Sequence, residues 1–162
     1  MPKPLTAALA ALAIAGLATA TPAAAQYKRE IGNDLAACSG QGPALRVTVN
    51  GIRSGTGTIR VQSYRARSSE WMAKGKWLTR TELPARRGSM VVCVPLSGPG
   101  TFGVAVRHDT NGNGETDIRS DGGGMSNNPP INIFNLGKPS YRQVATAVGH
   151  EVKSITINLR YM

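Results

Sequence analysis

The sequence has few of the side chains that form catalytic sites: of its 162 residues, two are histidine, two are cysteine and 9 are acidic. It contains no Gly-x-Ser-x-Gly or Ser-x-x-Lys motif, and no His-Glu-x-x-His or Cys-x-x-Cys spacing. These absences remove the sequence support for the familiar serine hydrolases, zinc proteases and thiol redox centres. We therefore expect a protein that is not an enzyme.

The enzymatic alternative is a hydrolase of unfamiliar type that uses His108, which directly precedes Asp109. Consecutive residues of a strand point to opposite faces of a sheet, so this pair cannot readily form a hydrogen-bonded dyad. His150, the second histidine, lies in a Val-Gly-His-Glu turn. We expect His108 to pack at a strand end or to hydrogen-bond to the neighbouring loop.

The sequence has a single long apolar run, residues 5–20, which is rich in alanine and leucine. Lys3 precedes this run, and three alanines at 23–25 follow it in a small-x-small pattern. The pattern predicts a signal peptide over residues 1–25 and a mature chain that starts at Gln26, in the periplasm or secreted. The alternative is an uncleaved anchor, but the run is shorter than the ~20 residues that span a bilayer. We expect no membrane span.

Acidic residues are outnumbered by 19 Lys and Arg, which gives a formal net charge of +10. Loss of Lys3 with the signal peptide leaves 19 − 1 = 18 basic and 9 acidic residues, or +9. An exported chain meets lipopolysaccharide, anionic lipid and acidic polysaccharide rather than nucleic acid. The simpler interpretation is that the basic residues solvate the outward faces of strands. Four arginines lie between apolar residues in alternating runs, namely Arg46, Arg60, Arg107 and Arg160.

Cysteine is limited to Cys38 and Cys93, both beyond the predicted cleavage site. Outside the cytoplasm two cysteines usually form one disulfide, and no metal-ligand spacing supports another role. A bridge that closes so long a loop stabilises a fold by about 4 kcal/mol in the chain-entropy model. We therefore expect a structural disulfide between Cys38 and Cys93.

Apolar and polar residues alternate over most of the chain after residue 43. Turns rich in glycine and proline separate the alternating segments, and helical periodicity is almost absent. The sequence therefore predicts an all-β fold, an antiparallel β-sandwich of about seven short strands. The expected strands cover residues 45–50, 59–64, 79–84, 89–96, 101–108, 141–148 and 152–161.

Three other segments lack this alternation. Residues 26–42 are polar and aperiodic, so we expect a mobile lead-in segment to a single β-sandwich domain over residues 43–162. Residues 66–78 are predicted to form a short helical turn, because serines at its start can cap it. Residues 121–130 are too rich in Gly, Asn and Pro for a regular element.

Oxygen-bearing side chains recur at every second position from 109 to 117, with Gly112 and Gly114 between them. Calcium binds six to eight oxygens at roughly 2.3–2.6 Å, and a sharply turned loop can supply most of them. A glycine at the sixth position allows the turn, and Gly114 is the sixth residue from Asp109. The pattern predicts a calcium site. The predicted ligands are the side chains of Asp109, Asn111, Asn113 and Asp117 and the carbonyl of Glu115.

The alternative is a tight turn without an ion, because turns favour Asp, Asn and Gly for backbone reasons alone. The loop is also not a conventional EF-hand: Ser120 stands at the twelfth position, and a predicted strand enters the loop. Asp109 and Asp117 are the only charged side-chain ligands, so we expect an affinity on the order of 0.1–1 mM, as in extracellular modules. Asp121 could add a carboxylate by folding back.

Residues 102–117, Phe-Gly-Val-Ala-Val-Arg-His-Asp-Thr-Asn-Gly-Asn-Gly-Glu-Thr-Asp, followed by Met-Ser-Asn-Asn, resemble the hallmark of a bacterial exported family catalogued as domain of unknown function 2141. The resemblance implies an immunoglobulin- or transthyretin-like β-sandwich outside the cytoplasm, and it assigns no activity. The chain departs from the family pattern at residues 119–124, where relatives carry a longer stretch with a proline and an acidic residue. Supporting segments are residues 49–53, 57–61, 96–100 and 157–161.

Together these features predict an exported, non-enzymatic β-sandwich binding module, stabilised by a disulfide and a calcium ion. Its working surface would be residues 108–128, where Ser-Asn-Asn at 126–128 offers hydrogen bonds to a glycan or peptide. Trp71 and Trp77 are expected to cover the core, with stacking on a sugar as the alternative. The other interpretation is an envelope protein that binds anionic polymer through its basic face.

Overall fold

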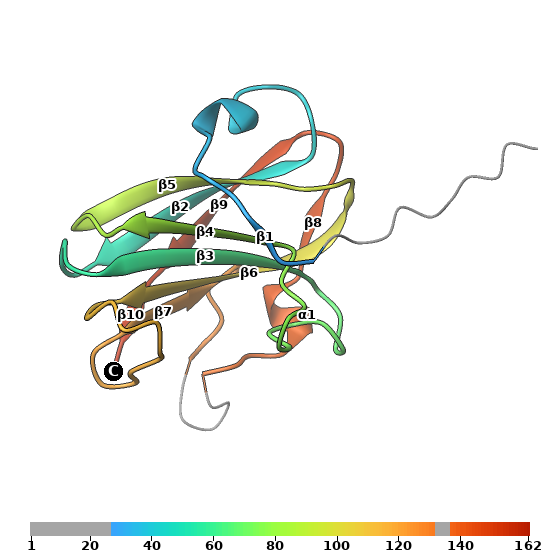
Figure 1. The fold of residues 1–162 in the computed structure, drawn as a ribbon. Helices are drawn as coiled ribbons and strands as arrows, with labels where there is room; N and C mark the ends of the chain where they lie inside the picture. Colours follow the sequence, from blue (N-terminus) through green and yellow to red (C-terminus); the bar gives the residue numbers. More distant parts are fainter. Residues whose placement is uncertain (1–26, 132–136) are drawn as a thin grey trace, which may run out of the picture.

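A computed structural model describes residues 27–131 and 137–162 of the chain (Figure 1). The predicted signal peptide lies outside these residues. The described chain forms two sheets that pack face to face, with the apolar core between them. The prediction of an all-β sandwich is confirmed.

The larger sheet contains seven strands, ordered β1-β4-β3-β6-β7-β10, with β8 pairing with β6 beyond the end of β7. Neighbouring strands are antiparallel except β1 and β4, which are parallel. The strands are β1 (Arg29–Glu30), β3 (Thr58–Arg65), β4 (Thr79–Pro84), β6 (Gly100–Asp109), β7 (Gly122–Met125), β8 (Thr146–Val148) and β10 (Arg160–Tyr161).

The smaller sheet contains β5 (Gly88–Pro95), β2 (Ala44–Ile52) and β9 (Val152–Asn158), in the order β5-β2-β9. The β2–β5 pair is antiparallel, whereas β2 and β9 are parallel. Alternate residues of β2 point into the core, as the period of two requires: Leu45, Val47 and Val49 are fully buried. Figure 1 shows this sheet behind the larger one.

The segment predicted as the strand 141–148 begins instead with a short helix, α1 (Tyr141–Val144), and only β8 is a strand. Ser140 and Gln143 form a capping-box arrangement, in which Gln143 Oε1 accepts from the amide of Ser140 at 3.0 Å and the amide of Gln143 donates to the carbonyl of Ser140 at 3.0 Å. This local exchange satisfies donors at the helix start and overrides the alternation of the sequence. Neither described helix, α1 or the 3-10 helix η1 (Leu35–Cys38), is long and apolar enough to cross a membrane.

Residues 66–78, predicted as a helical turn, form a series of turns rather than a helix. The amide of Trp71 does bond to the carbonyl of Arg67, but Met72 has a φ of 51° and Gly75 a φ of 74°. Left-handed residues at these positions end the helical path. Trp71 is nevertheless buried, as expected for a residue that covers the core.

The prediction that residues 121–130 contain no regular element is wrong, because β7 lies within them. Its first three residues are glycines, and two of them approach other chain segments closely. A Cβ on Gly122 would lie 2.5 Å from the ring of Tyr161, and one on Gly124 would lie 2.7 Å from Ile157. Glycine carries no side chain to alternate, so this strand is invisible to a hydrophobicity pattern.

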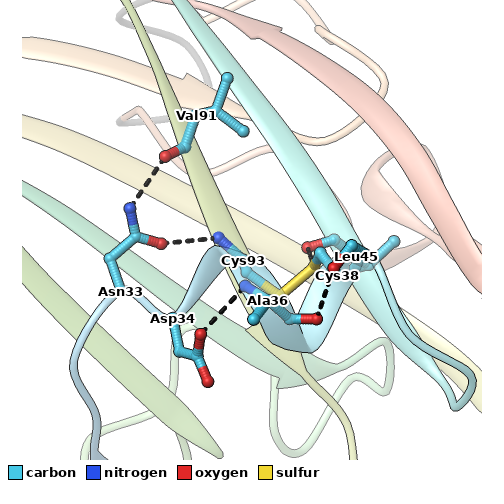
Figure 2. Close-up of a disulfide and its surroundings, with 8 residues drawn as sticks. Asn33, Asp34, Ala36, Cys38, Leu45, Val91 and Cys93 are labelled. Atoms are coloured by element: carbon cyan, nitrogen blue, oxygen red, sulfur yellow. Dashed lines mark hydrogen bonds between the residues drawn. A yellow bond between two sulfur atoms is a disulfide. The ribbon is translucent and has the colours of Figure 1, made fainter.

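The segment 27–42, expected as a mobile lead-in, contributes β1 to the larger sheet and η1 to the disulfide. Cys38 in η1 and Cys93 in β5 are joined, as the sequence predicts, and both are buried. Figure 2 shows the bridge beside Asn33, whose amide pairs with the edge of β5. Its Oδ1 accepts from the Cys93 amide at 2.9 Å, and its Nδ2 donates to the Val91 carbonyl at 2.9 Å.

The opposite edge of the smaller sheet is paired in the same way by Asn128. Its Oδ1 accepts from the amide of Asn158 at 2.7 Å, and its Nδ2 donates to the carbonyl of Thr156 at 2.9 Å. A side-chain amide has the donor and acceptor of a peptide group, so it replaces one step of a neighbouring strand. Each edge of this three-stranded sheet is therefore partly shielded from pairing with another chain.

We expect removal of the disulfide to lower the free energy of unfolding by about 4 kcal/mol, because the bridge closes a loop with a sequence separation of 55. Urea unfolding, followed by tryptophan fluorescence with and without reductant, measures this difference. The double variant Cys38→Ser/Cys93→Ser serves as the control, since its unfolding should not respond to reductant. Equal unfolding of the oxidised and reduced wild-type protein would contradict a stabilising role.

Candidate functional site

The oxygen-rich loop, residues 110–121, connects β6 to β7 at one end of the sandwich, beside the C-terminus (Figure 1). Its shape is set by two buried carboxylates, one at each end. Asp109, at the end of β6, is 3% exposed. Its Oδ1 accepts from the amide of Gly112 at 2.8 Å, and its Oδ2 from the amide of Gly114 at 2.8 Å. Both glycines have positive φ, 71° and 82°, which turns their amides toward the carboxylate.

Asp121, 7% exposed, holds the other end of the loop. Its Oδ1 accepts from the amide of Thr110 at 3.1 Å and from the Thr110 hydroxyl at 3.2 Å. Its Oδ2 accepts from the amide of Asp117 at 3.0 Å. Asp121 therefore folds back onto the loop, where it accepts from two backbone amides and from the Thr110 hydroxyl.

Asn111, Asn113 and Asp117 form a linked group at the exposed tip. The amide nitrogens of both asparagines donate to Asp117 Oδ2, at 2.8 Å and 2.9 Å. Their oxygens accept from backbone amides two residues ahead: Asn111 Oδ1 from Asn113, and Asn113 Oδ1 from Glu115. The loop thus links Asn111, Asn113 and Asp117 to one another, whereas the Asp109 carboxylate bonds to the amides of Gly112 and Gly114. Within residues 27–131 and 137–162 no three His, Cys, Asp or Glu side chains group as a metal site.

Arg107 is part of this site, although its sequence context indicated only a solvated strand face. Its Nη1 donates to the Thr116 hydroxyl and its Nη2 to the Gly114 carbonyl, both at 2.8 Å, and Nη2 lies 3.4 Å from Asp109 Oδ2. Burial lowers the pKa of the Arg107 guanidinium, and the positive charge of neighbouring Arg60 lowers it further. The loop therefore already encloses one cation, which belongs to the chain itself.

His108 is fully buried and does not contact Asp109 through its ring. Its Nε2 lies 2.8 Å from the carbonyl of Thr56, so this nitrogen carries the hydrogen. Its Nδ1 lies 2.6 Å from the hydroxyl of Tyr161, which also accepts from the Arg53 amide at 3.1 Å. Nδ1 is therefore the acceptor, and Tyr161 donates to it. Burial raises the pKa of Tyr161, which keeps that donor protonated.

The Ser-Asn-Asn segment at 126–128, expected to meet a ligand, is used within the fold. Ser126 donates to the carbonyl of Val144 at 2.6 Å and is itself fully buried. Asn127 donates to the carbonyls of Gln143 and Ala145, and Asn128 pairs with β9. Their hydrogen bonds hold α1 and the smaller sheet, so these side chains have a structural role in the fold.

Both tryptophans are packing residues. Trp71 is 2% exposed and Trp77 is 8% exposed. The Trp71 ring lies edge-on to Tyr64, with 5.3 Å between centroids, and its Nε1 donates to the carbonyl of Pro139 at 2.9 Å. A Cβ on Gly103 would lie 2.7 Å from the Trp71 ring, so the strand allows the indole to lie flat against it. Neither ring is free to stack on a sugar.

We expect Tyr161→Phe to lower the free energy of unfolding by about 1–3 kcal/mol, because it leaves the buried Nδ1 of His108 without a donor. Tyr141→Phe is the matched control: the Tyr141 hydroxyl has no hydrogen-bond partner among the described residues, so the change should stay within about 0.5 kcal/mol. Urea unfolding of the three proteins gives the comparison. Equal effects of the two substitutions would contradict the assigned hydrogen bond.

The family comparison bears on the same residues. A family model described as an uncharacterized protein conserved in bacteria (DUF2141) matches residues 47–156, a span that includes β6, the oxygen-rich loop and β7. No curated protein and no solved structure matches the chain. The match covers more than half of the sequence and agrees with the resemblance carried by the His-Asp-Thr-Asn-Gly-Asn-Gly segment. The chain therefore belongs to the bacterial family DUF2141.

Proposed function

We propose that this chain is an exported, non-enzymatic β-sandwich module whose oxygen-rich loop binds calcium and forms part of a binding surface. The observation that carries the proposal is that two buried carboxylates, Asp109 and Asp121, hold the loop backbone in place. A loop that is already ordered loses little conformational entropy when it binds an ion. The remaining oxygens, on Asn111, Asn113 and Asp117, then lie at an exposed tip.

The donor set fits a hard cation, because every predicted ligand atom is an oxygen. Asp117 accepts its two asparagine bonds through Oδ2. Among the described residues its Oδ1 has no hydrogen-bond partner. Each asparagine oxygen accepts one backbone amide and has a second lone pair available. Calcium would take the place of the two amide hydrogens that now face Asp117. This exchange, with few charged ligands, supports an affinity on the order of 0.1–1 mM.

The environment of His108 supports a module without catalytic activity. Both ring nitrogens are engaged, one by a backbone carbonyl and the other by Tyr161, and the side chain is 0% exposed. A general base must reach the proton that it abstracts from the substrate. His108 has neither a free nitrogen nor access to solvent, so we propose that its role is to hold β10 against the loop between β2 and β3.

We expect calcium to raise the midpoint of thermal unfolding of residues 26–162, a segment that includes every described strand and helix. At a calcium concentration ten- to a hundredfold above Kd, mass action stabilises the folded state by about 1.4–2.7 kcal/mol, or several degrees. The measurement compares protein in EDTA with protein in about 10 mM calcium, which is ten- to a hundredfold above a Kd of about 0.1–1 mM, with magnesium and zinc as ion controls. An unchanged midpoint would identify the loop as a turn that needs no ion.

Asp117→Asn tests the site without removing its hydrogen-bond acceptor. The variant keeps an oxygen for the two asparagine amides but removes the negative charge, so the calcium-dependent rise should fall to less than a third. Glu151→Gln removes a charge from an exposed carboxylate in a different turn and should leave the rise intact. A full rise in Asp117→Asn would place the ion elsewhere.

A further inference from the structure

Four chain segments meet at the end of the sandwich that carries the oxygen-rich loop, and we call their surface the basic end. They are residues 53–57, 85–87, 110–121 and 160–162 (Figure 1). The amide of Ala85 donates to the carbonyl of Gly57 at 3.0 Å, and the amide of Arg53 donates to Tyr161. A Cβ on Gly57 would clash with the backbone of Asp109, so the first and third segments also touch. The four segments therefore form one connected surface.

Exposed arginines lie on every segment of the basic end, and the surface has no lysine. Among the described residues, none of these arginines forms an ion pair with a carboxylate. The arginines on the outer face of the larger sheet differ in this respect, because Arg60, Arg80 and Arg107 each pair with an acidic residue. The unpaired arginines of the basic end are Arg53, Arg86, Arg87, Arg119 and Arg160.

Two large apolar side chains accompany these arginines. Ile118, in the oxygen-rich loop, is 67% exposed, and Met162, the last residue, is 57% exposed. They are the two most exposed large hydrophobic residues in the part of the chain that the structure describes. Exposed apolar side chains among unpaired cations are the combination that binds at a lipid–water interface.

We propose that the basic end docks on the surface of a bilayer that contains anionic lipids. The guanidinium groups would bind lipid phosphates, for which the planar arginine fork is better suited than lysine. Each basic residue near such a surface contributes about fivefold to the partition coefficient. Ile118 and Met162 would enter the boundary between headgroups and acyl chains.

The apolar pair distinguishes a lipid surface from a soluble polyanion. A polysaccharide or nucleic acid would satisfy the arginines equally well, but it offers no apolar phase to Ile118 or Met162. Docking also does not require calcium, since none of the five arginines lies in the proposed ion site. The exposed carboxylate of Glu115 and the half-buried carboxylate of Asp117 oppose an anionic surface, so the vesicle experiment is done in EDTA and does not depend on the calcium proposal.

The experiment is co-sedimentation of residues 26–162 with vesicles of phosphatidylcholine alone or with about a third phosphatidylglycerol, in EDTA. We expect binding to the anionic vesicles only, weakened at high salt because exposed charges are screened. Arg86→Gln/Arg87→Gln should lower the partition coefficient by about 25-fold, which is two arginines at about fivefold each. Ile118→Ser should lower it by about tenfold through the loss of apolar burial.

The matched control is Lys74→Gln/Lys138→Gln, which removes the same charge from exposed residues near the opposite end of the sandwich. It should change the partition coefficient by less than threefold, and circular dichroism should show that every variant is folded. Equal losses in both double variants would overturn a localised docking surface. Binding to dextran sulfate as tight as to vesicles, together with no effect of Ile118→Ser, would overturn the lipid assignment in favour of a polymer.

Discussion

Two buried carboxylates, Asp109 and Asp121, determine the geometry of the end of the sandwich that carries the oxygen-rich loop. A carboxylate inside a protein requires donors, because burying its charge without them is costly. Asp109 and Asp121 obtain these donors from the backbone of residues 110–117, so the loop must fold around them. The need of these two carboxylates for donors therefore fixes the path of the loop backbone, and with it the position of the exposed loop tip.

Arg107 and Tyr161 extend this constraint into the sheets. The guanidinium of Arg107, which belongs to β6, donates to Thr116 and Gly114 of the loop. It also lies close to the carboxylate of Asp109 and compensates its negative charge. Tyr161 in β10 bonds to His108 in β6 of the same sheet and to the amide of Arg53, so the last strand is fixed to two other segments. Arg53 also lies over the Tyr161 ring, 4.3 Å from its centroid. The loop, the C-terminus and the turn after β2 therefore form one rigid surface.

The two edges of the smaller sheet pair with side-chain amides rather than with further strands. Asn33 and Asn128 each supply one amide step at an edge, and the disulfide holds the segment that carries Asn33. Asn128 hydrogen-bonds to β9 of the smaller sheet, and Ser126 hydrogen-bonds to α1 and to β6 of the larger sheet. The Ser-Asn-Asn segment therefore links the two sheets. A segment that the sequence marked for recognition is thus part of the scaffold.

The sequence predicted those features that depend on neighbours along the chain. Strands with alternating valines, such as β2 and β6, were predictable because the period of two is local. The glycine strand β7 was not, since its glycines have no side chains to alternate. Helix α1 replaced a predicted strand because the Ser140–Gln143 capping box outweighed the weak alternation there. The oxygen-rich loop was located correctly, but the partners of Asp121 were not.

By itself, then, the sequence determined the fold class, the disulfide and the position of the oxygen-rich loop, because periodicity, cysteine count and turn chemistry are properties of short segments or of composition. Only the tertiary structure decided which polar residues are free. Arg107, His108 and Ser126 find their partners across strands or loops, and the arginines of the basic end form no ion pair with a carboxylate among the described residues. Hydrogen bonds and charges are satisfied in three dimensions, so no local pattern can tell a scaffold residue from one that faces a ligand.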